Sequence, residues 1–551
     1  MLIKKQFTLY KYLIILSLMI TLFTSISCDR TQNKIYVRYY HINEAEKIEP
    51  DYKSFEPSFL KFILLNDYYK NIAFSPILYN NSFFYLRSKT LHTVDLDKIK
   101  TYESIVAKFD QIDSYKIVET DKENICIAQD VNLLHKPYII DGERIFYAGY
   151  FINDNTSLGE GYISCYNLKS KKIDWKKNLN LGLTIHSLDH TFSLLKTPEG
   201  ILFTTIKPSL MYLLDKDTGK IKWIYDPEKD FNEVGNNVIT HSMADIRKFN
   251  FNILYFCNEG ILADLQYTDK DSKFYIEKFL LINWNGKMVR ELKEKPILVF
   301  DGKYLYETRK EKNNKLIIEL TCKTISEGKK VWKFEYENYY DEKCQLPYKE
   351  NFSKSEDLIY LTVRGKEKEG CYMYGVNLYS GRTIFKGNFK EEIIDIYPLE
   401  DKVVVLLKDG ALLNNSEYNV YDIVSLSRDK SFSINWIVKM KVNKENESDF
   451  FTEENINYVI EENSKIIVLL NNSYIIIDPF LKSASISTYY QIVEELNARN
   501  SFLESFLFYF KSSRLLKINV FENKKWIILA FHEQTRGMPI KCVMFFNKNY
   551  Y

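Results

Sequence analysis

Short apolar runs, separated by polar or glycine-containing turns, recur along most of the chain and predict strands. Residues 144–149, 200–204 and 402–407 are typical, because each continues from a charged residue or glycine into a run of apolar side chains. Short runs bounded by turn signals are typical of strands, whereas helices need longer periodic segments. The 42 Tyr and 36 Phe residues also favour the pleated surface of a sheet. The pattern therefore predicts an all-β chain.

One segment adds a clear turn to this pattern. Residues 212–223, Tyr-Leu-Leu-Asp-Lys-Asp-Thr-Gly-Lys-Ile-Lys-Trp, contain an apolar strand, a polar turn and a second strand that alternates apolar and charged residues. Asp215 and Thr218 are turn-forming residues, and Gly219 can adopt the positive φ that such a turn needs. The segment therefore predicts a β-hairpin that ends at Trp223.

The same arrangement recurs along the chain. In residues 167–175 a polar turn residue again stands eight positions before a Trp, and residues 377–385 repeat that spacing with Phe in place of Trp. Weaker copies, which bring the number of candidates to eight, lie at 94–98, 283–289, 323–332, 425–436 and 477–482. The residues that carry the clearer copies are Asn167 and Trp175, Gly328 and Trp332, and Asn377, Gly381 and Phe385. A hairpin repeated in this way predicts a repeat architecture.

The pattern apolar-apolar-Asp-x-x-Thr-Gly-x-x-x-Trp resembles the blade repeat of PQQ-like, quinoprotein-type β-propellers. Asp215, Thr218, Gly219 and Trp223 carry the full match, and the other copies match in part. The resemblance implies four-stranded blades in which the Trp that ends each copy is buried between neighbouring blades. We therefore expect one PQQ-like β-propeller over residues 61–551, with about eight blades and with seven as the alternative.

Other stretches predict how the propeller closes and where it is interrupted. The strand-like segments at 35–40 and 526–531 lie near the two ends of the chain, so we expect the N-terminal strand to complete the last blade. Polar stretches at 226–247, 335–355 and 441–462 predict enlarged loops between strands. Apolar residues at roughly helical spacing predict one helix within residues 490–510.

The N-terminal segment has the pattern of an export signal. Three lysines precede an apolar run at residues 12–23, which is long enough for a signal peptide and short for a membrane span. Residues 25–28, Ser-Ile-Ser-Cys, resemble a bacterial lipobox, which implies cleavage before Cys28 and lipid attachment to its thiol. We therefore expect a signal peptide at 1–27 and a lipidated tether at 28–60. Plain secretion after cleavage and an uncleaved membrane anchor are the alternatives.

Charge and cysteine spacing exclude several kinds of function. Lys and Arg number 75 against 73 Asp and Glu, so the chain lacks the positive excess with which proteins hold nucleic acid. Removal of residues 1–27, with their three lysines, changes the formal net charge from +2 to −1. The seven cysteines after Cys28 form no CxxC pair, so no zinc or redox motif is expected. His186 and His190 would lie about 13 Å apart on a strand, too far to share one metal ion.

The residues that the quinoprotein enzymes use are not recognisable in this chain. Dehydrogenases of that superfamily bind PQQ against a disulfide between adjacent cysteines and use calcium together with a catalytic Asp. This sequence has no adjacent cysteines, and no Gly-x-Ser-x-Gly or Walker segment stands in a supporting context. We therefore expect no cofactor, no metal ion and no catalytic residue.

The expected function is a non-catalytic protein-interaction scaffold. A lipidated propeller of this kind is similar in build to the BamB-type outer-membrane assembly lipoproteins. This similarity implies attachment to a membrane through the N-terminal lipid, contact with envelope proteins and no contact with nucleic acid. The expected location is the cell envelope, either at the outer membrane or on the periplasmic side of the inner membrane. A quinoprotein-type enzyme or ligand-binding propeller with a degenerate site is the first alternative, and a surface lipoprotein that contacts host or neighbouring cells is the second.

Overall fold

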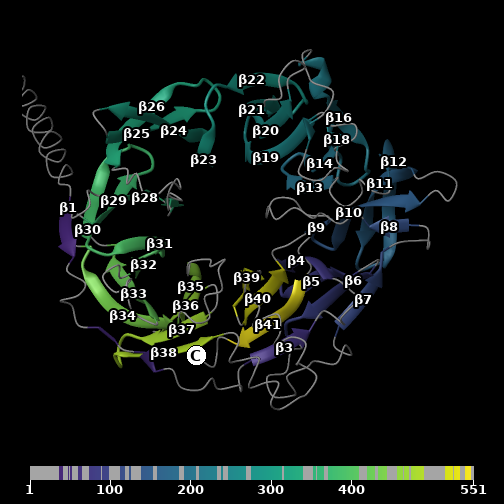
Figure 1. Ribbon diagram of the computed structural model, residues 1–551. Coiled ribbons are helices and arrows are strands. Elements are labelled where there is room, and N and C mark those ends of the chain that lie inside the picture. The colour runs from purple at the N-terminus through teal and green to yellow at the C-terminus, as the bar shows by residue number, and fades with distance from the viewer. Residues whose placement is uncertain are drawn as a thin grey trace, which may run out of the picture. The chain divides into compact units, whose positions relative to one another are not determined.

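In the computed structural model of the protein, β-strands follow one another along the chain (Figure 1). The structure describes residues 36–40, 47–48, 50–51, 60–64, 73–87, 90–97, 112–117, 123–125, 138–152, 158–184, 192–205, 210–231, 238–239, 246–247, 249–268, 275–312, 315–338, 352–354, 357–364, 370–408, 418–428, 432–443, 456–462, 465–470, 473–488, 516–524, 526–533 and 540–547. One turn of 3₁₀ helix, Pro227–Lys229, interrupts the strands in these ranges, and no helix within them has the length and apolar character needed to cross a bilayer. The expected signal peptide, Cys28 and the helix-like stretch at 490–510 lie outside the described residues.

The chain divides into two compact units. The smaller unit consists of residues 1–48, 311–317 and 336–443, and the larger unit of residues 49–310, 318–335 and 444–551.

The smaller unit contains two antiparallel sheets whose strands follow chain order. The β27–β30 sheet contains β27 (Phe352–Lys354), β28 (Leu358–Arg364), β29 (Cys371–Asn377) and β30 (Thr383–Phe389), with β1 (Tyr36–Tyr40) added parallel to β30. The β31–β34 sheet contains β31 (Glu392–Pro398), β32 (Lys402–Lys408), β33 (Tyr418–Ser427) and β34 (Ile434–Asn443). Buried side chains from both sheets, including Tyr360, Phe389 and Val405, form one core.

Most strands of the larger unit also form antiparallel sheets in chain order. The β9–β12 sheet contains β8 (Glu123–Ile125), β9 (Tyr138–Asp141), β10 (Arg144–Ile152), β11 (Leu158–Asn167) and β12 (Lys172–Thr184). The β13–β16 sheet contains β13 (Phe192–Thr197), β14 (Gly200–Thr205), β15 (Met211–Leu214) and β16 (Ile221–Tyr225). The β19–β22 sheet contains β19 (Phe249–Cys257), β20 (Gly260–Thr268), β21 (Tyr275–Asn283) and β22 (Met288–Leu292).

The β23–β26 sheet, most of which belongs to the larger unit, contains β23 (Pro296–Phe300), β24 (Lys303–Lys312), β25 (Lys315–Thr324) and β26 (Lys330–Asn338). The β35–β38 sheet contains β35 (Ile456–Glu462), β36 (Lys465–Leu470), β37 (Ser473–Asp478) and β38 (Ser483–Thr488), with β2 (Pro50–Asp51) added parallel to β38. A short hairpin joins β17 (Val238–Ile239) to β18 (Ile246–Arg247).

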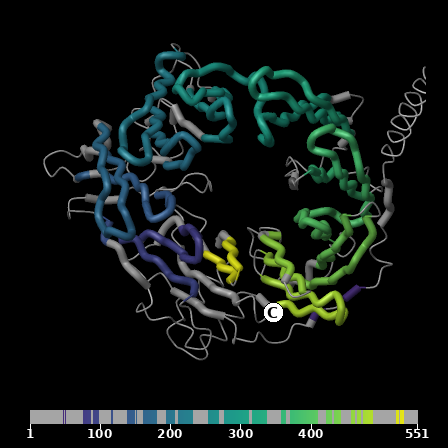
Figure 2. The backbone as a smooth tube through the Cα atoms, turned by 180° about the vertical axis from the view of Figure 1, so that it is seen from behind, coloured from purple at the N-terminus to yellow at the C-terminus, as the bar shows by residue number. Residues whose placement is uncertain are grey.

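Strands from both ends of the chain share one eight-stranded sheet in the larger unit. Its N-terminal strands are β3 (Leu60–Leu64), β4 (Ala73–Tyr79), β5 (Ser82–Arg87), β6 (Thr90–Asp95) and β7 (Ile112–Lys116), and its C-terminal strands are β39 (Leu516–Glu522), β40 (Trp526–Glu533) and β41 (Ile540–Asn547). β41 pairs with β3 over five residues and with β4 through the single pair Ala73 and Ile540. Figure 2 shows the C-terminal strands beside the N-terminal ones.

This arrangement corrects the expected closing strand. We expected residues 35–40 to pair with the last strands of the chain, but Tyr36–Tyr40 pairs with β30 instead, and β3 and β4 take the place beside β41. Both segments are strand-like, and local pattern does not specify which edge such a segment joins.

Neighbouring sheets of the larger unit pack face to face. In β14, the side chains of Ile201 and Phe203 enter a core shared with the β9–β12 sheet, whereas Leu202 enters a core shared with the β19–β22 sheet. Every residue of β14 is therefore buried, which explains its uninterrupted apolar pattern. The β19–β22 and β23–β26 sheets share a further core, as do the β4–β7 strands and the β9–β12 sheet.

The predicted all-β, β-propeller class is confirmed, since four-stranded antiparallel sheets follow one another in chain order and stack on both faces of their middle strands. Among the residues that the structure describes, eight sheets have four or more strands. The eight-stranded one joins β4–β7 to a second set formed by β39–β41 and β3, so the number of blades and the PQQ-like type stay predictions.

Candidate functional site

All eight copies of the predicted motif occupy the same place in the fold. Each lies at the turn between the third and fourth strands of a four-stranded set, namely β6–β7, β11–β12, β15–β16, β21–β22, β25–β26, β29–β30, β33–β34 and β37–β38. The motif is therefore a repeated turn, and the candidate site is built from these turns and the side chains that contact them.

The turn at Asp215 is closed by its own side chains. One carboxylate oxygen of Asp215 accepts hydrogen bonds from the amides of Asp217 and Thr218, at 3.2 and 2.9 Å, and from the Thr218 hydroxyl at 2.8 Å. The Gly219 amide donates to the Asp215 carbonyl at 2.9 Å, and Gly219 has a φ of +67°. The hydrogen bonds from Thr218 lower the pKa of Asp215. Asp215, Thr218 and Gly219 thus act as one turn.

Two other copies form the same turn with different side chains. In the smaller unit, the side-chain oxygen of Asn377 accepts from the amides of Tyr379 and Ser380, at 3.2 and 2.9 Å, and from the Ser380 hydroxyl at 2.8 Å. Gly381 also has a φ of +67°. In the larger unit, Asn167 accepts from two turn amides at 3.0 Å each. An Asx side chain that accepts from the backbone is therefore the shared feature.

The Trp that ends one copy lies against the turn of the next sheet. The indole nitrogen of Trp175, on β12, donates to the Lys216 carbonyl in the β15–β16 turn at 3.1 Å. A Cβ atom at Gly219 would lie 2.5 Å from Cε3 of Trp175, so no side chain fits between them. Glycine is therefore required at this position both by its φ and by the indole above it.

The same contact joins the next two sheets. Trp223, on β16, donates through its indole nitrogen to the Trp284 carbonyl in the β21–β22 turn at 2.8 Å. A Cβ atom at Gly286 would lie 2.7 Å from Cδ2 of Trp223. Each indole thus holds the following turn by one hydrogen bond and one ring contact. We call the contact of a fourth-strand side chain with the turn of the next sheet turn docking.

An arginine takes the place of Trp in the following sheet, which the motif spacing did not indicate. Arg290 pairs with Leu281 as Trp223 pairs with Leu213. Its Nη1 atom lies 3.4 Å from the Ile325 carbonyl in the β25–β26 turn, to which it donates. Because the turn before Arg290 is one residue shorter, Arg290 stands where the motif has Trp, and that shift is the signal the sequence offered.

A phenylalanine pair serves the same purpose in the smaller unit. Phe385, on β30, stacks on Phe432 in the β33–β34 turn, with ring centroids 4.1 Å apart and an interplanar angle of 18°. Phe385 is fully buried, and Phe432 adopts a φ of +44°. Phe385 was identified from the sequence, whereas Phe432 was not, because it lies in a longer turn.

The expected burial of the motif tryptophans holds for only part of the set. Trp332 and Trp436 are buried, at 6% and 8% exposed, but Trp175 and Trp223 are only partly buried. The two partly buried rings cover turns at the ends of strands instead of lying between middle strands, so solvent reaches them. Gly328 has a φ of +68° at the turn beside Arg290.

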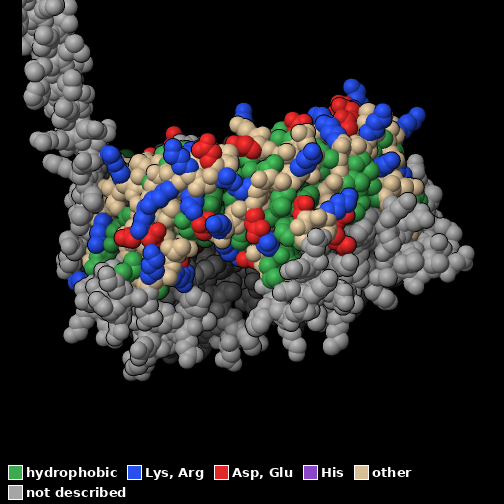
Figure 3. All heavy atoms as spheres, turned by 90° about the horizontal axis from the view of Figure 1, so that it is seen from above, with side chains coloured by type: hydrophobic (Ala, Val, Ile, Leu, Met, Phe, Trp, Pro, Cys, Tyr) green, Lys and Arg blue, Asp and Glu red, His purple; other side chains and the backbone are tan. Residues whose placement is uncertain are grey.

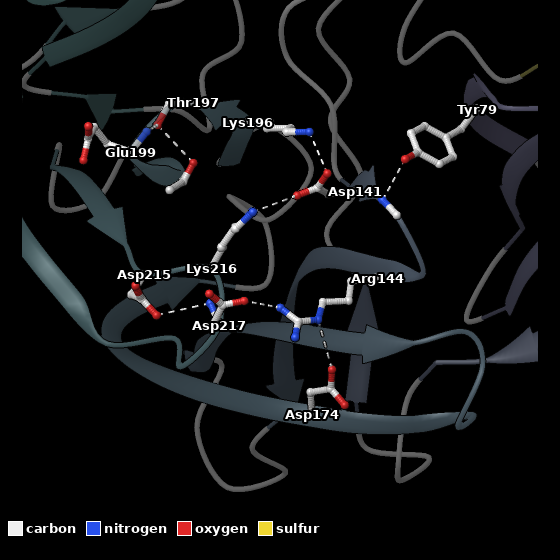
Figure 4. Close-up of polar contacts among 12 residues, drawn as sticks. Tyr79, Asp141, Arg144, Asp174, Lys196, Thr197, Glu199, Asp215, Lys216 and Asp217 are labelled. Atoms are coloured by element: carbon white, nitrogen blue, oxygen red, sulfur yellow. Dashed lines mark hydrogen bonds and ion pairs between the residues drawn. The ribbon is translucent and has the colours of Figure 1, made fainter.

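Ion pairs accompany turn docking between the β9–β12 and β13–β16 sheets (Figure 4). Arg144 lies between two carboxylates, with Nη1 at 2.5 Å from Asp217 and Nε at 3.4 Å from Asp174. Asp141 accepts from Lys196 at 2.6 Å and lies 3.6 Å from Lys216, and the Lys196 hydrogen bond lowers its pKa. Exposed pairs contribute little stability individually, so this network aligns the two sheets more than it stabilises them.

A buried carboxyl lies apart from the turns, in the β19–β22 sheet. Asp264, on β20, is 4% exposed, and its Oδ2 accepts from Gln266 at 2.7 Å while Oδ1 has no hydrogen-bond partner among the described groups. Glu277, which lies 3.4 Å from the same Gln266 nitrogen, pairs with Lys295 at 2.8 Å. Burial, and then the charge of Glu277, raise the pKa of Asp264 to about 7. Sequence reasoning missed this residue, and the one signal for it was a single Asp inside an apolar run.

The described cysteines do not fit the quinone platform of the quinoprotein enzymes. Cys165, Cys257, Cys322 and Cys371 are free thiols on four different sheets, and burial raises the pKa of Cys165 to about 12 and of Cys322 to about 11. Among the described residues, no three His, Cys, Asp or Glu side chains gather as they would around a metal ion. Cys28, His186 and His190 lie outside the described residues.

On one face of the molecule, charged side chains of both signs are interspersed. On the face in Figure 3, Lys and Arg side chains alternate with Asp and Glu side chains and form no continuous basic stripe. This distribution agrees with the balanced composition of 75 basic and 73 acidic residues.

Comparison with known proteins gives distant matches to solved structures. No protein-family model and no curated protein sequence matches the chain. A eukaryotic initiation factor aligns over 75% of this chain and 87% of its own, at 8% identity and a TM-score of 0.34. The Nup133 β-propeller domain of Vanderwaltozyma polyspora aligns over 78% and 99%, at 15% identity and a TM-score of 0.25. The Pan2 WD40 domain of Neurospora crassa aligns over 65% and 88%, at 9% identity and a TM-score of 0.24. Similarity at this level assigns neither a family nor a function to the chain.

Proposed function

We propose that the protein is an exported, lipid-anchored scaffold that binds other proteins of the cell envelope and catalyses no reaction. The observation that supports this proposal is turn docking, in which Trp175, Trp223, Arg290 and Phe385 each hold the next turn in place. A series of sheets fixed to one another is a rigid support, and loops on a rigid support commonly carry recognition.

The anchor rests on the N-terminal pattern of three lysines, an apolar run at 12–23 and Ser-Ile-Ser-Cys at 25–28. Three acyl chains on Cys28 would hold the body at the outer membrane or on the periplasmic side of the inner membrane. Mass spectrometry of the protein from its own cells tests this. A mature chain that begins at lipidated Cys28 supports the anchor, and an unmodified Cys28 or a different first residue overturns it.

Recognition is assigned to those parts of the predicted loops at 226–247, 335–355 and 441–462 that lie outside strands. The predicted bounds were too wide, since residues 335–338, 352–354, 441–443 and 456–462 belong to β26, β27, β34 and β35. The test is crosslinking in cells. A photoactivatable residue is placed in each loop in turn, with matched positions in the tether at 31–33 as controls. Crosslinks from at least one loop to a defined envelope protein support the scaffold. Crosslinks that come only from the tether contradict it, because they report proximity to the membrane alone.

The enzyme alternative and the scaffold proposal predict different results when the purified protein is titrated with PQQ and calcium. A quinoprotein-type site would bind PQQ with calcium stoichiometrically, which calorimetry and the absorbance of the quinone both detect. The scaffold proposal predicts no saturable binding of PQQ in the presence of calcium. Stoichiometric binding would move the assignment to an enzyme or ligand-binding propeller.

A further inference from the structure

The N-terminal segment of the chain runs along the outer edges of sheets as an added strand. In the smaller unit, β1 pairs in parallel with the last strand of the β27–β30 sheet over five residues, from Tyr36 opposite Phe385 to Tyr40 opposite Phe389. Ile48 is likewise added in parallel to β34. Its amide donates to the Ile437 carbonyl at 2.8 Å, and its carbonyl accepts from the Lys439 amide at 3.1 Å. We call the described residues of this segment, 36–40, 47–48 and 50–51, the strap.

The strap ends in the larger unit and is anchored by a charge pair in the smaller one. Pro50 and Asp51 pair in parallel with Ala484 and Ser485 of β38, again the last strand of its sheet. Before this contact, the Lys47 ammonium lies 2.7 Å from the Asp422 carboxylate, and the two side chains are only 12% and 1% exposed. An extended segment added in parallel is therefore the way in which this protein covers a sheet edge.

Among the described residues, three last strands of the larger unit combine an outer edge without an added strand with an exposed apolar side chain. Within the described part of the chain, no strand pairs with the outer edges of β16, β22 and β26, which are the last strands of three consecutive sheets. Each of them exposes a β-branched apolar side chain: Ile224 is 47%, Val289 54% and Val331 41% exposed. An exposed strand edge with apolar side chains is a template for another strand.

Residues at the same position of the motif can be compared between a covered edge and one without an added strand. Ile437 and Ile224 both follow the motif Trp by one position, on β34 and β16. Ile437, whose carbonyl accepts the strap amide of Ile48, is 1% exposed, whereas Ile224 is 47% exposed. Ile437 also belongs to the core between the two sheets of the smaller unit, and that packing accounts for its burial. What the strap adds at this position is the main-chain pairing, which the outer edge of β16 lacks among the described residues.

We propose that the outer edges of β16, β22 and β26 bind an extended segment of a partner protein as an added parallel strand, in the mode of the strap. The segment would offer main-chain hydrogen bonds to the edge and alternating apolar side chains to Ile224, Val289 and Val331. Charged side chains along these edges form ion pairs, Lys333 on β26 with Glu319 and Glu335, and Glu291 on β22 with Lys278. Recognition would therefore depend on the main chain and the apolar side chains of the segment and not on its net charge. The inference rests on the proposed scaffold function and names its partner class.

The test uses a synthetic peptide of residues 35–51, which include the strap, added to the full-length protein. Amide hydrogen exchange is measured with and without the peptide. The expected result is at least a fivefold slowing of exchange in β16, β22 and β26, with no change in β30, β34 and β38, which the strap already covers. Slow exchange at the three edges before the peptide is added, or slowing confined to β30, β34 and β38, would overturn the proposal.

Charged substitutions at the edges supply the matched variants. The triple variant Ile224→Lys, Val289→Lys and Val331→Lys should weaken peptide binding at least tenfold, measured by fluorescence anisotropy of the labelled peptide. Ile297→Lys is the control, because Ile297 is 44% exposed but lies on β23, the first strand of its sheet. Equal affinity for both variants would refute edge binding. Since all four side chains are exposed, circular dichroism and thermal melts should show that every variant folds.

Two further outcomes separate this inference from the proposals around it. Concentration-dependent dimerisation that protects the same edges without peptide would assign them to a second copy of this chain and refute a partner segment. Loop crosslinks in cells, combined with unprotected edges in the peptide experiment, would refute this inference and leave the scaffold proposal standing. Protected edges without any loop crosslinks would support edge binding and refute recognition through the loops.

Discussion

Single residues differ in how they contribute to the stability of the fold. Asp264 is a buried carboxyl whose ionisation at high pH destabilises the folded protein. Its pKa is raised from an ordinary value of 3.8 to about 7, so the folded protein favours the protonated form. A raised carboxyl pKa contributes stability that is fully present below the unfolded value and is lost as pH rises through the folded value. The sign is therefore opposite to that of a salt-bridged carboxylate.

Asp264→Asn should remove this pH dependence. Between pH 5 and pH 8 the original protein should lose about 2–3 kcal/mol relative to the variant, because one pKa unit corresponds to about 1.4 kcal/mol. Urea denaturation at the two pH values measures the difference. Asp401→Asn is the control, since that side chain is 69% exposed, and it should not change the pH dependence. Equal curves for Asp264→Asn and the original protein would show that Asp264 is ionised in the fold.

The two docked tryptophans differ from a buried one in a way that stability measurements can detect. Trp223 is partly buried, whereas Trp526, whose indole donates to the Leu96 carbonyl at 3.1 Å, is 1% exposed. Removal of a fully buried Trp costs about 3–5 kcal/mol. We therefore expect about 2 kcal/mol for Trp223→Ala and about 4 kcal/mol for Trp526→Ala. A larger loss for Trp223→Ala than for Trp526→Ala would contradict this order.

At the scale of elements, the turn and the indole that docks on it form one unit. Gly219→Ala should cost about 2–3 kcal/mol, since a positive φ costs about 1 kcal/mol for alanine and the new Cβ would meet Trp175. Gly302→Ala is the matched control, because Gly302 has a φ of +66° and a Cβ atom there would meet nothing within 4 Å. It should cost about 1 kcal/mol. In a Trp175→Ala background the cost at Gly219 should fall to the control value, and full additivity would show that the two residues do not interact.

The strap contains one buried ion pair, between Lys47 and Asp422, in addition to its main-chain pairing. Lys47→Ala would leave the Asp422 carboxylate buried without its cation and should cost about 3–5 kcal/mol, with faster amide exchange in β34. Lys295→Ala, which breaks a pair with Glu277 while Lys295 itself is 65% exposed, should cost less than about 1 kcal/mol. Similar losses for the two variants would show that the strap does not depend on Lys47.

Elements also show which features the sequence could predict. The Asp215 turn was predictable because its hydrogen bonds join residues at most five positions apart, so a short stretch of sequence contains the whole structure. The strap was not, because its partners in β30, β34 and β38 lie more than 300 residues away. Arg290 and Phe432 were missed for a related reason. The shorter turn before Arg290 was visible in the sequence, but its meaning depends on the strand register. The role of Phe432 depends on a residue of the neighbouring sheet.

At the scale of the whole molecule, a repeated turn joins neighbouring sheets and the strap covers the edges of β30, β34 and β38. The proposed scaffold would meet its partners through its loops and through the edges of β16, β22 and β26. We infer from these features that the protein acts through contact with another protein. Native mass spectrometry of the protein, extracted in detergent from its own cells, tests this inference directly, because it measures the mass of any complex that the protein forms. We expect the mass of a chain that starts at acylated Cys28 together with a stoichiometric envelope protein. A lone chain that carries an adduct with the mass of a quinone cofactor and calcium would show instead that the protein acts as an enzyme.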